Sequence, residues 1–392
     1  MTIPTTRDVR ALFGITFLTR TISIIVQTVS PIVLVKILET PASEIGWMIA
    51  GFWIANALGT IIAAGIIRSR NRSTLSGFAV LALAFFGAAL IQDPLGYSLS
   101  IVLSGFGLSL IQAFLIPTMH LSGTDERPHK GIADYSTALS FGMIAGPLIA
   151  GASIYLSGYY DLFFLLVAIS IVVFIISFRI GIQKSFVGED TRKGILPSNI
   201  IKTMKQRGFA NFYMMNFLYS LLLPILISYG GVFAENEFHV TTTQVLVLFA
   251  AVFLVSSILR VLFSRSETKH FRTYLMIGFI VLGLSFALIG LANNQYLLLA
   301  GFLLFSVPHA LIYPITTYLA LDSAGPDALI SSTYIFSTSS GIAEFLSPLA
   351  AVPIIAVYGF SALFFALTPI AVIGLFLSIV IPRLKRRTKI SL

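Results

Sequence analysis

Residues 146–164 read GPLIAGASIYLSGYYDLFF, and residues 347–365 read SPLAAVPIIAVYGFSALFF. The two stretches align without a gap, so that a proline, a Phe-Phe pair and the glycines Gly158 and Gly359 fall at matching positions. An alignment of this length within one chain indicates that the chain repeats itself.

A second pair of stretches supports the repeat. SGFGLSLIQAFLIP (104–117) matches AGFLLFSVPHALIYP (300–314) in the same order relative to the first pair. The sequence therefore predicts two homologous halves, 1–180 and 209–392, joined by a basic linker at 181–208. Two parallel repeats of six helices are an architecture of secondary transporters, with a substrate site between the halves at mid-membrane.

The composition places this chain in a membrane. Of its 392 residues 57% are hydrophobic and only 10% are charged, and the mean hydropathy is +0.94, whereas soluble domains carry roughly 25% charged residues. The lipid bilayer is therefore an expected partner. The chain contains no cysteine, which excludes disulfides, thiolate metal sites and cysteine nucleophiles.

A helix needs roughly 20 apolar residues to cross a bilayer, and on that basis the sequence predicts an all-α protein with twelve spans. They lie near 11–36, 45–67, 74–91, 97–119, 133–156, 162–180, 210–233, 243–263, 273–291, 296–320, 329–357 and 361–381. The basic loop segments all fall on one face, and only Lys36 reaches the other face. By the positive-inside rule both termini are expected in the cytoplasm, with the protein in the cell membrane.

Two further motifs carry a resemblance to a known family. GMIAGPLIAG (142–151) is similar to the GxxxGPxxGG motif in span five of proton-driven efflux proteins, with Ala150 in place of one glycine. GIIRSRNRSTL (65–75) is similar to the GxLaDrxGrr loop motif, with Ser69 in place of the aspartate. In its spans, repeat and motifs the chain resembles the major facilitator superfamily. The resemblance implies that spans one, four, seven and ten line a central cavity, and that spans two and eleven, and five and eight, pack across the halves.

Arg20, His309 and Glu344 lie deep within predicted spans, where a charge costs about 2.5–3.5 kcal/mol or more. Arg20 either faces the cavity as a fixed cation or extends towards the cytoplasmic surface as an anchor. Glu344 is a candidate proton carrier, since burial favours the neutral acid and a nearby cation favours the carboxylate; its alternative is a permanent structural hydrogen bond. His309 either relays the proton or donates to a carbonyl freed by a neighbouring proline.

Other polar side chains on the expected cavity helices are candidates for substrate binding, because amides and phenols orient polar ligands. Each is also compatible with a hydrogen bond between helices. With Arg20 and His309, the candidate substrate-binding residues are Gln27, Gln112, Asn216, Tyr219 and Tyr313.

Charged residues near the cytoplasmic ends of spans are candidates for a gate that closes by pairing across the halves. Such pairs usually contribute about 0–1 kcal/mol each, and the alternative is that these charges only set topology. The candidate gating residues are Arg68, Arg70 and Arg72 with Asp322 and Asp327, and Asp134 with Arg260.

The sequence favours a secondary transporter that exports a small organic molecule in exchange for protons. The alternatives are uptake or facilitated diffusion of a sugar or organic anion, and a receptor or lipid-handling protein on the same fold. No phosphate loop, HExxH motif or metal-ligand cluster is present, so we expect no enzyme activity and no cofactor. We expect a monomer. The net charge of +9 comes from basic residues in loops on one face, where they indicate membrane topology, so we expect no nucleic-acid partner.

Overall fold

The computed structural model describes residues 6–63, 67, 70–113, 115, 130–180, 197–206, 208–264, 270–324 and 329–380. Within these ranges every regular element is a helix. The predicted all-α class is confirmed.

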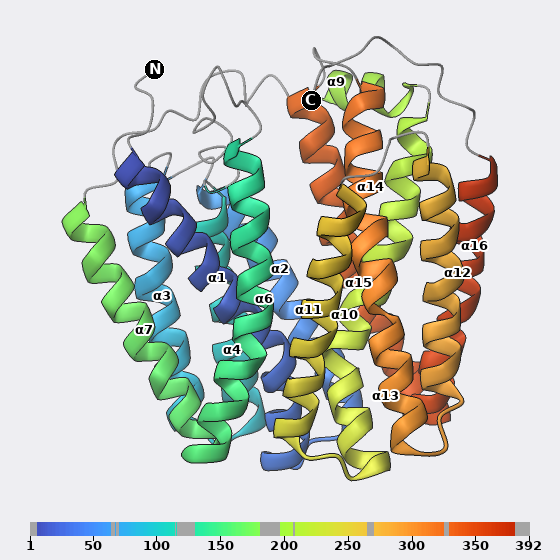
Figure 1. Cartoon of the computed structure of the whole chain (residues 1–392). Helices are drawn as coiled ribbons and strands as arrows, with labels where there is room; N and C mark the ends of the chain where they lie inside the picture. The colour runs from blue at the N-terminus through green and yellow to red at the C-terminus, as the bar shows by residue number, and fades with distance from the viewer. Residues whose placement is uncertain are drawn as a thin grey trace.

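The helices form two bundles, which Figure 1 shows side by side. The first bundle contains α1 (Thr6–Ile32) with the π-helical turn η1 (Val33–Ile37), the 3-10 turn η2 (Ala42–Glu44), α2 (Ile45–Ile62), α3 (Arg70–Leu90), α4 (Pro94–Gln112), α6 (Lys130–Leu156) and α7 (Tyr159–Ile180). After the short helix α9 (Pro197–Met204), the second bundle contains α10 (Phe209–Phe238), α11 (Thr242–Ser264), α12 (Phe271–Gly290), α13 (Gln295–Leu304), α14 (Ser306–Ala324), α15 (Leu329–Ala366) and α16 (Thr368–Val380). We call the end where α1 begins and α16 ends, at the top of Figure 1, the terminal end, and the other the opposite end.

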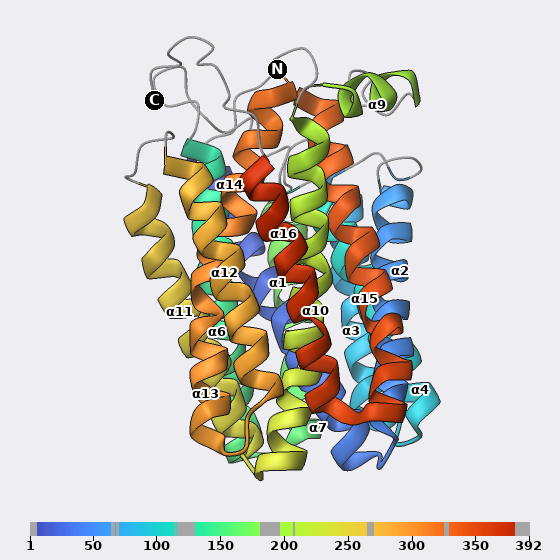
Figure 2. The same cartoon turned by 90° about the vertical axis from the view of Figure 1, so that its right-hand side faces the viewer.

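The number of crossings follows from one glycine. Eleven stretches of the described chain are long and apolar enough to cross a membrane, and the last, Thr338–Val380, has 43 residues. Within it Gly359 has a φ of 78°, which interrupts a right-handed helix. Figure 2 shows the chain descending in α15 and rising again in α16. The predicted twelve spans are therefore present, and Gly158, the repeat counterpart of Gly359, also has a positive φ, 102°, between α6 and α7.

Close helix packing joins the two bundles. α2 contacts α15, α6 contacts α11 and α1 contacts α10, and the first two pairs are those that the resemblance implied. At Gly46 of α2 an added Cβ would lie 2.2 Å from Cγ2 of Val352 and 2.7 Å from the carbonyl oxygen of Pro348. Small residues permit such close approach, which van der Waals contact then stabilises in a membrane.

Two glycines of the 142–151 motif bring α6 against α1. A Cβ at Gly142 would lie 2.7 Å from the carbonyl oxygen of Phe17 and 2.8 Å from Cβ of Arg20, and one at Gly146 would lie 2.1 Å from Cγ2 of Ile24. The glycines are four residues apart and share one face of α6. The motif therefore fixes the position of the α1 backbone at Arg20.

The tenth crossing is broken into α13 and α14 at Phe305. Pro308 lacks an N–H, and its ring clashes with the carbonyl group four residues earlier, which belongs to Leu304. The break falls directly after that residue, and it positions His309 on the first turn of α14.

Candidate functional site

Arg20 lies between the two bundles, on α1. Its Nη2 donates a hydrogen bond to Sδ of Met143 on α6 at 3.4 Å. Its Nε is buried and has no hydrogen-bond partner among the described residues. This hydrogen bond leaves most of the guanidinium N–H donors of Arg20 without a partner among the described residues.

A second arginine reaches the same face of α6. Arg260, on α11, donates from Nη1 to Oγ of Ser140 at 3.3 Å and from Nη2 to the carbonyl oxygen of His309 at 3.4 Å. Its Nε is also buried without a described partner. Ser140 and Met143 are three residues apart on one helix, which places their side chains as neighbours. Arg20 and Arg260 therefore approach adjacent positions, and their charges act on one another.

Neither arginine has an acidic contact in the described part of the chain. The ion pair found there, with N···O under 4.0 Å, is Lys36 with Glu235. Glu344 on α15 is the carboxyl group whose charge acts most strongly on Arg20, although it does not reach ion-pair distance. The site therefore contains two guanidinium groups and one separate carboxyl group.

Glu344 lies one helical turn after Ser340 on α15, and Ser340 forms hydrogen bonds with two residues of α10. Ser340 accepts hydrogen bonds at Oγ from Nδ2 of Asn216 at 2.9 Å and from Oγ of Ser220 at 3.2 Å, both on α10. Residues four apart share a helix face, so Glu344 lies on the same face as Ser340. The buried Oδ1 of Asn216 has no partner among the described residues.

Tyr219 and His309 form the aromatic wall of the site. A hydrogen bond of 2.5 Å joins Oη of Tyr219 to Nδ1 of His309, and the two rings stack together and against Phe305. Both side chains are buried. Two residues that the sequence singled out separately thus meet in one contact between α10 and α14, and their part in substrate binding or proton transfer stays a prediction.

Tyr313 marks open space beside the arginines. It leaves 47% of its surface exposed, yet the charges of Arg20, Arg260 and Glu344 all act on it. These groups belong to three different helices, so the Tyr313 ring faces the interior between the bundles. The exposed part of its surface therefore borders the space beside the two arginines.

The two glutamines predicted to bind substrate lie apart from this cluster. Gln27 is buried on α1 and donates to Oγ of Ser23 at 2.8 Å, within its own helix. Gln112 is half-buried at the end of α4. Their contribution to a substrate site stays a prediction.

The candidate gating residues are not brought together. Arg72 and Asp322 are exposed, on α3 and α14 respectively, and Asp134 forms no ion pair with Arg260. Arg68 and Asp327 and the side chain of Arg70 lie outside the described residues. Pairing between these groups in another conformation stays a prediction.

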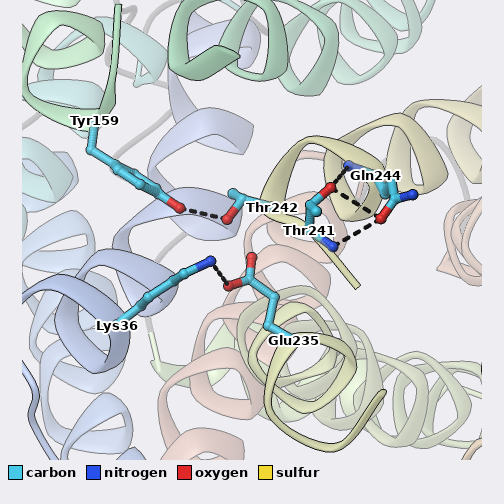
Figure 3. Close-up of polar contacts among 6 residues, drawn as sticks. All are labelled: Lys36, Tyr159, Glu235, Thr241, Thr242 and Gln244. Atoms are coloured by element: carbon cyan, nitrogen blue, oxygen red, sulfur yellow. Dashed lines mark hydrogen bonds and ion pairs between the residues drawn. The ribbon is translucent and has the colours of Figure 1, made fainter. Parts of the chain in front are cut away.

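Polar contacts join the two bundles at the opposite end (Figure 3). Nζ of Lys36 lies 3.1 Å from Oε2 of Glu235 on α10, and Oη of Tyr159 lies 2.5 Å from Oγ1 of Thr242 on α11. The Glu235 side chain is 6% exposed and that of Lys36 is 50% exposed. Each contact joins the first bundle to the second.

The start of α11 is itself fixed by a capping box, the arrangement in which the first and fourth residues exchange hydrogen bonds. The backbone N–H of Thr241 donates to Oε1 of Gln244 at 2.9 Å, and the N–H of Gln244 donates to Oγ1 of Thr241 at 3.3 Å. Thr242 is therefore held in place to meet Tyr159 (Figure 3).

Comparison with known proteins identifies the family. A profile of the Major Facilitator Superfamily matches residues 12–265 and, again, residues 208–391. The chain belongs to the Major Facilitator Superfamily. It is therefore a multi-pass membrane protein of a transporter family. No match is found among curated protein sequences.

Solved structures of transporters share the fold at low sequence identity. The nucleoside transporter NupG is 14% identical with a TM-score of 0.71, over 96% of this chain and all (100%) of that one. A POT family transporter in complex with a thioalcohol-conjugated peptide is 14% identical with a TM-score of 0.77, over 95% and 96%. A bacterial homologue of the human lysosomal transporter Spinster, inward-facing and unoccupied, is 12% identical with a TM-score of 0.75, over 96% and 97%. These likenesses concern the fold.

Sequence reasoning missed the central position of Arg260 and the part played by Ser340. Arg260 was expected at the edge of its span, but the apolar residues VLF that follow it were a sign that it lies about one turn inside. Ser340 precedes Glu344 by four residues, the spacing of one helical turn, which would have placed the two on one face.

Proposed function

We propose that this protein is a proton-coupled secondary transporter that moves a small organic molecule across the cell membrane by alternating access, with both termini in the cytoplasm. The observation that carries the proposal is the cluster of Arg20, Arg260 and Glu344 between two membrane-embedded bundles. Charged groups at such depth are costly, and they mark substrate or ion pathways. The contacts at the opposite end support a conformation closed to the exterior and accessible from the cytoplasm.

In this mechanism the bundles, residues 1–180 and 209–392, rock against one another about the central site while the linker 181–208 keeps them joined. Glu344 takes up and releases the proton, and Arg20 stabilises the ionised carboxylate or engages the substrate. Tyr219 and His309 frame the site. Export by exchange with protons is the direction that the motif of α6 favours.

Uptake or facilitated diffusion of an organic anion is a second candidate. The observation in its favour is that both central arginines lack a carboxylate contact in the described chain. A transporter of anions is expected to keep such cations free for its substrate.

The proposal is tested by replacing Glu344 with glutamine and assaying purified protein in liposomes. A pH-sensitive dye inside the liposomes reports proton movement when solutes from a panel of sugars, amino acids, organic anions and organic cations are added under a pH gradient. We expect Glu344→Gln to abolish accumulation against a gradient while exchange of labelled for unlabelled solute continues. Accumulation by the variant equal to that of the wild type would show that Glu344 does not couple transport to protons.

A further inference from the structure

The central site has an excess of positive charge. Arg20 and Arg260 contribute two guanidinium groups, which stay protonated in proteins, and Glu344 contributes one carboxyl group. Even when Glu344 is ionised, these three groups sum to one positive charge. An uncompensated charge in a poorly solvated interior is unfavourable unless a partner neutralises it.

The contacts that the two arginines make do not neutralise them. Their hydrogen-bond acceptors are a thioether sulfur on Met143, a hydroxyl on Ser140 and the backbone carbonyl of His309. All three are uncharged, and a guanidinium group has five N–H donors. In the described chain Arg20 therefore has four donors and Arg260 three donors without a protein partner.

The two sets of free donors converge. Arg20 contacts Met143 and Arg260 contacts Ser140, one turn apart on the same face of α6, and both charges act on Tyr313. Tyr313 leaves 47% of its surface exposed, so protein atoms do not fill all of the space beside it. Guanidinium groups bind carboxylate and phosphate oxygens in paired hydrogen bonds.

We propose that Arg20 and Arg260 together bind the anionic group of the substrate, so that the transported molecule is a small organic anion with a carboxylate or a phosphate. The proposal rests on the proposed function and holds for either direction of transport. The rings of Tyr219 and Tyr313 lie beside this position for the apolar part of the same molecule.

The competing account is that the arginines serve only to join helices. The two accounts predict opposite effects on the ligand-free protein. Arginines that join helices stabilise it, so Arg20→Gln and Arg260→Gln would lower its melting temperature. Arginines kept unpaired for a ligand are a cost to it, so the same substitutions leave the melting temperature unchanged or raise it.

The test uses four solutes that share one benzene ring and differ in their polar group: benzoate, phenyl phosphate, neutral benzyl alcohol and cationic benzylamine. Thermal unfolding of the purified full-length protein in detergent is measured at constant ionic strength, because a ligand that binds the folded state raises its apparent stability. We expect benzoate or phenyl phosphate to raise the melting temperature, and the alcohol and the amine to leave it unchanged. The comparison between benzoate and phenyl phosphate distinguishes the two anionic groups.

The variants assign the effect to the arginines. Arg20→Gln and Arg260→Gln should each weaken anion binding about 30-fold or more, as expected when one member of a buried charge pair is removed. Lys205→Gln removes an equal charge from an exposed position on the surface and should bind as the wild type does. Equal stabilisation of the Arg20→Gln protein by the anions would overturn the proposal, as would the absence of stabilisation by either anion.

Failure of this proposal is distinguishable from failure of the proposed function. Anion binding that depends on both arginines, without movement of the anion into liposomes, would contradict the transport function and leave the anion site standing. Transport of a neutral or cationic solute, without anion binding, would do the reverse.

Discussion

Lys36 and Arg20 are both cations of the first crossing, and their surroundings differ. Lys36, at the opposite end, lies 3.1 Å from a carboxylate of the second bundle. Arg20, between the bundles, has a sulfur atom as its hydrogen-bond acceptor on the protein. A cation with a carboxylate partner across the bundles holds two surfaces together, whereas a cation without one is available to a ligand. In the proposed mechanism, position along the first crossing therefore separates a residue that joins the bundles from one that is available to a ligand.

The largest effect on this comparison is expected from Gly142→Val. The new side chain would overlap the α1 backbone at Phe17 and Cβ of Arg20, so α6 must move away from α1 or the protein must fail to fold. We expect loss of most folded protein, measured as the monodisperse fraction in size-exclusion chromatography. Gly14→Ala on the same helix as Arg20 is the matched control, because a Cβ at Gly14 meets nothing within 4 Å. Normal folding of Gly142→Val would contradict the close packing described for this helix pair.

The second prediction concerns the negative charge in the centre. Glu344→Gln removes the carboxylate whose charge acts on Arg20. It therefore also removes the repulsion between that carboxylate and a bound anion. We expect benzoate or phenyl phosphate, whichever binds, to bind about tenfold more tightly to this variant, as measured by the concentration dependence of thermal stabilisation. Tighter binding would show that the ionised carboxylate repels the anion, whichever direction transport takes. Equal or weaker binding would contradict this charge account.

The third prediction compares the two members of the ion pair at the opposite end. Removing Lys36 leaves a buried carboxylate, because the Glu235 side chain is only 6% exposed, whereas removing Glu235 leaves a half-exposed ammonium. Lys36→Gln should therefore favour opening by about 1–2 kcal/mol, and Glu235→Gln by less than about 1 kcal/mol.

Opening can be measured by thiol labelling because the chain has no cysteine of its own. Ile32 is 1% exposed and lies against Gly231 of α10, so Ile32→Cys introduces a single thiol between the bundles. A membrane-impermeant maleimide should label this thiol faster in the Lys36→Gln background than in the Glu235→Gln background. The reverse order would show that burial of the carboxylate does not control the pair.

Much of the fold was predictable because hydropathy and repeats are local signals. Apolar runs of sufficient length define crossings, and the glycines that the repeat aligns, 158 and 359, both have positive φ in the structure. The ends of crossings were less well predicted. The break at Phe305 follows from a clash between Pro308 and an earlier carbonyl, which no apolar run reveals.

The residues of the candidate site were visible in the sequence, but their contacts were not. Arg20, Glu344, Tyr219 and His309 stood out because polar groups are rare in spans, and the structure brings them near one another. Arg260 was assigned to a gate because its distance from the surface depends on where α11 ends. Contacts such as that between Asn216 and Ser340 join residues far apart in the sequence, and no spacing rule within one helix can find them.

The smallest expected effect concerns the second contact at the opposite end. Tyr159→Phe keeps the ring and removes the hydroxyl that lies 2.5 Å from Oγ1 of Thr242, so it should cost about 0.5–1.5 kcal/mol of closure. In the Ile32→Cys assay this corresponds to a rise in labelling of about two- to tenfold. Tyr155→Phe, on an exposed side chain nearby in sequence, should leave labelling unchanged.

Because Thr242 is held by the capping box of α11, Gln244→Ala should reproduce part of the Tyr159→Phe effect and add little to it. Full additivity of the two changes would mean that the cap and the tyrosine act independently.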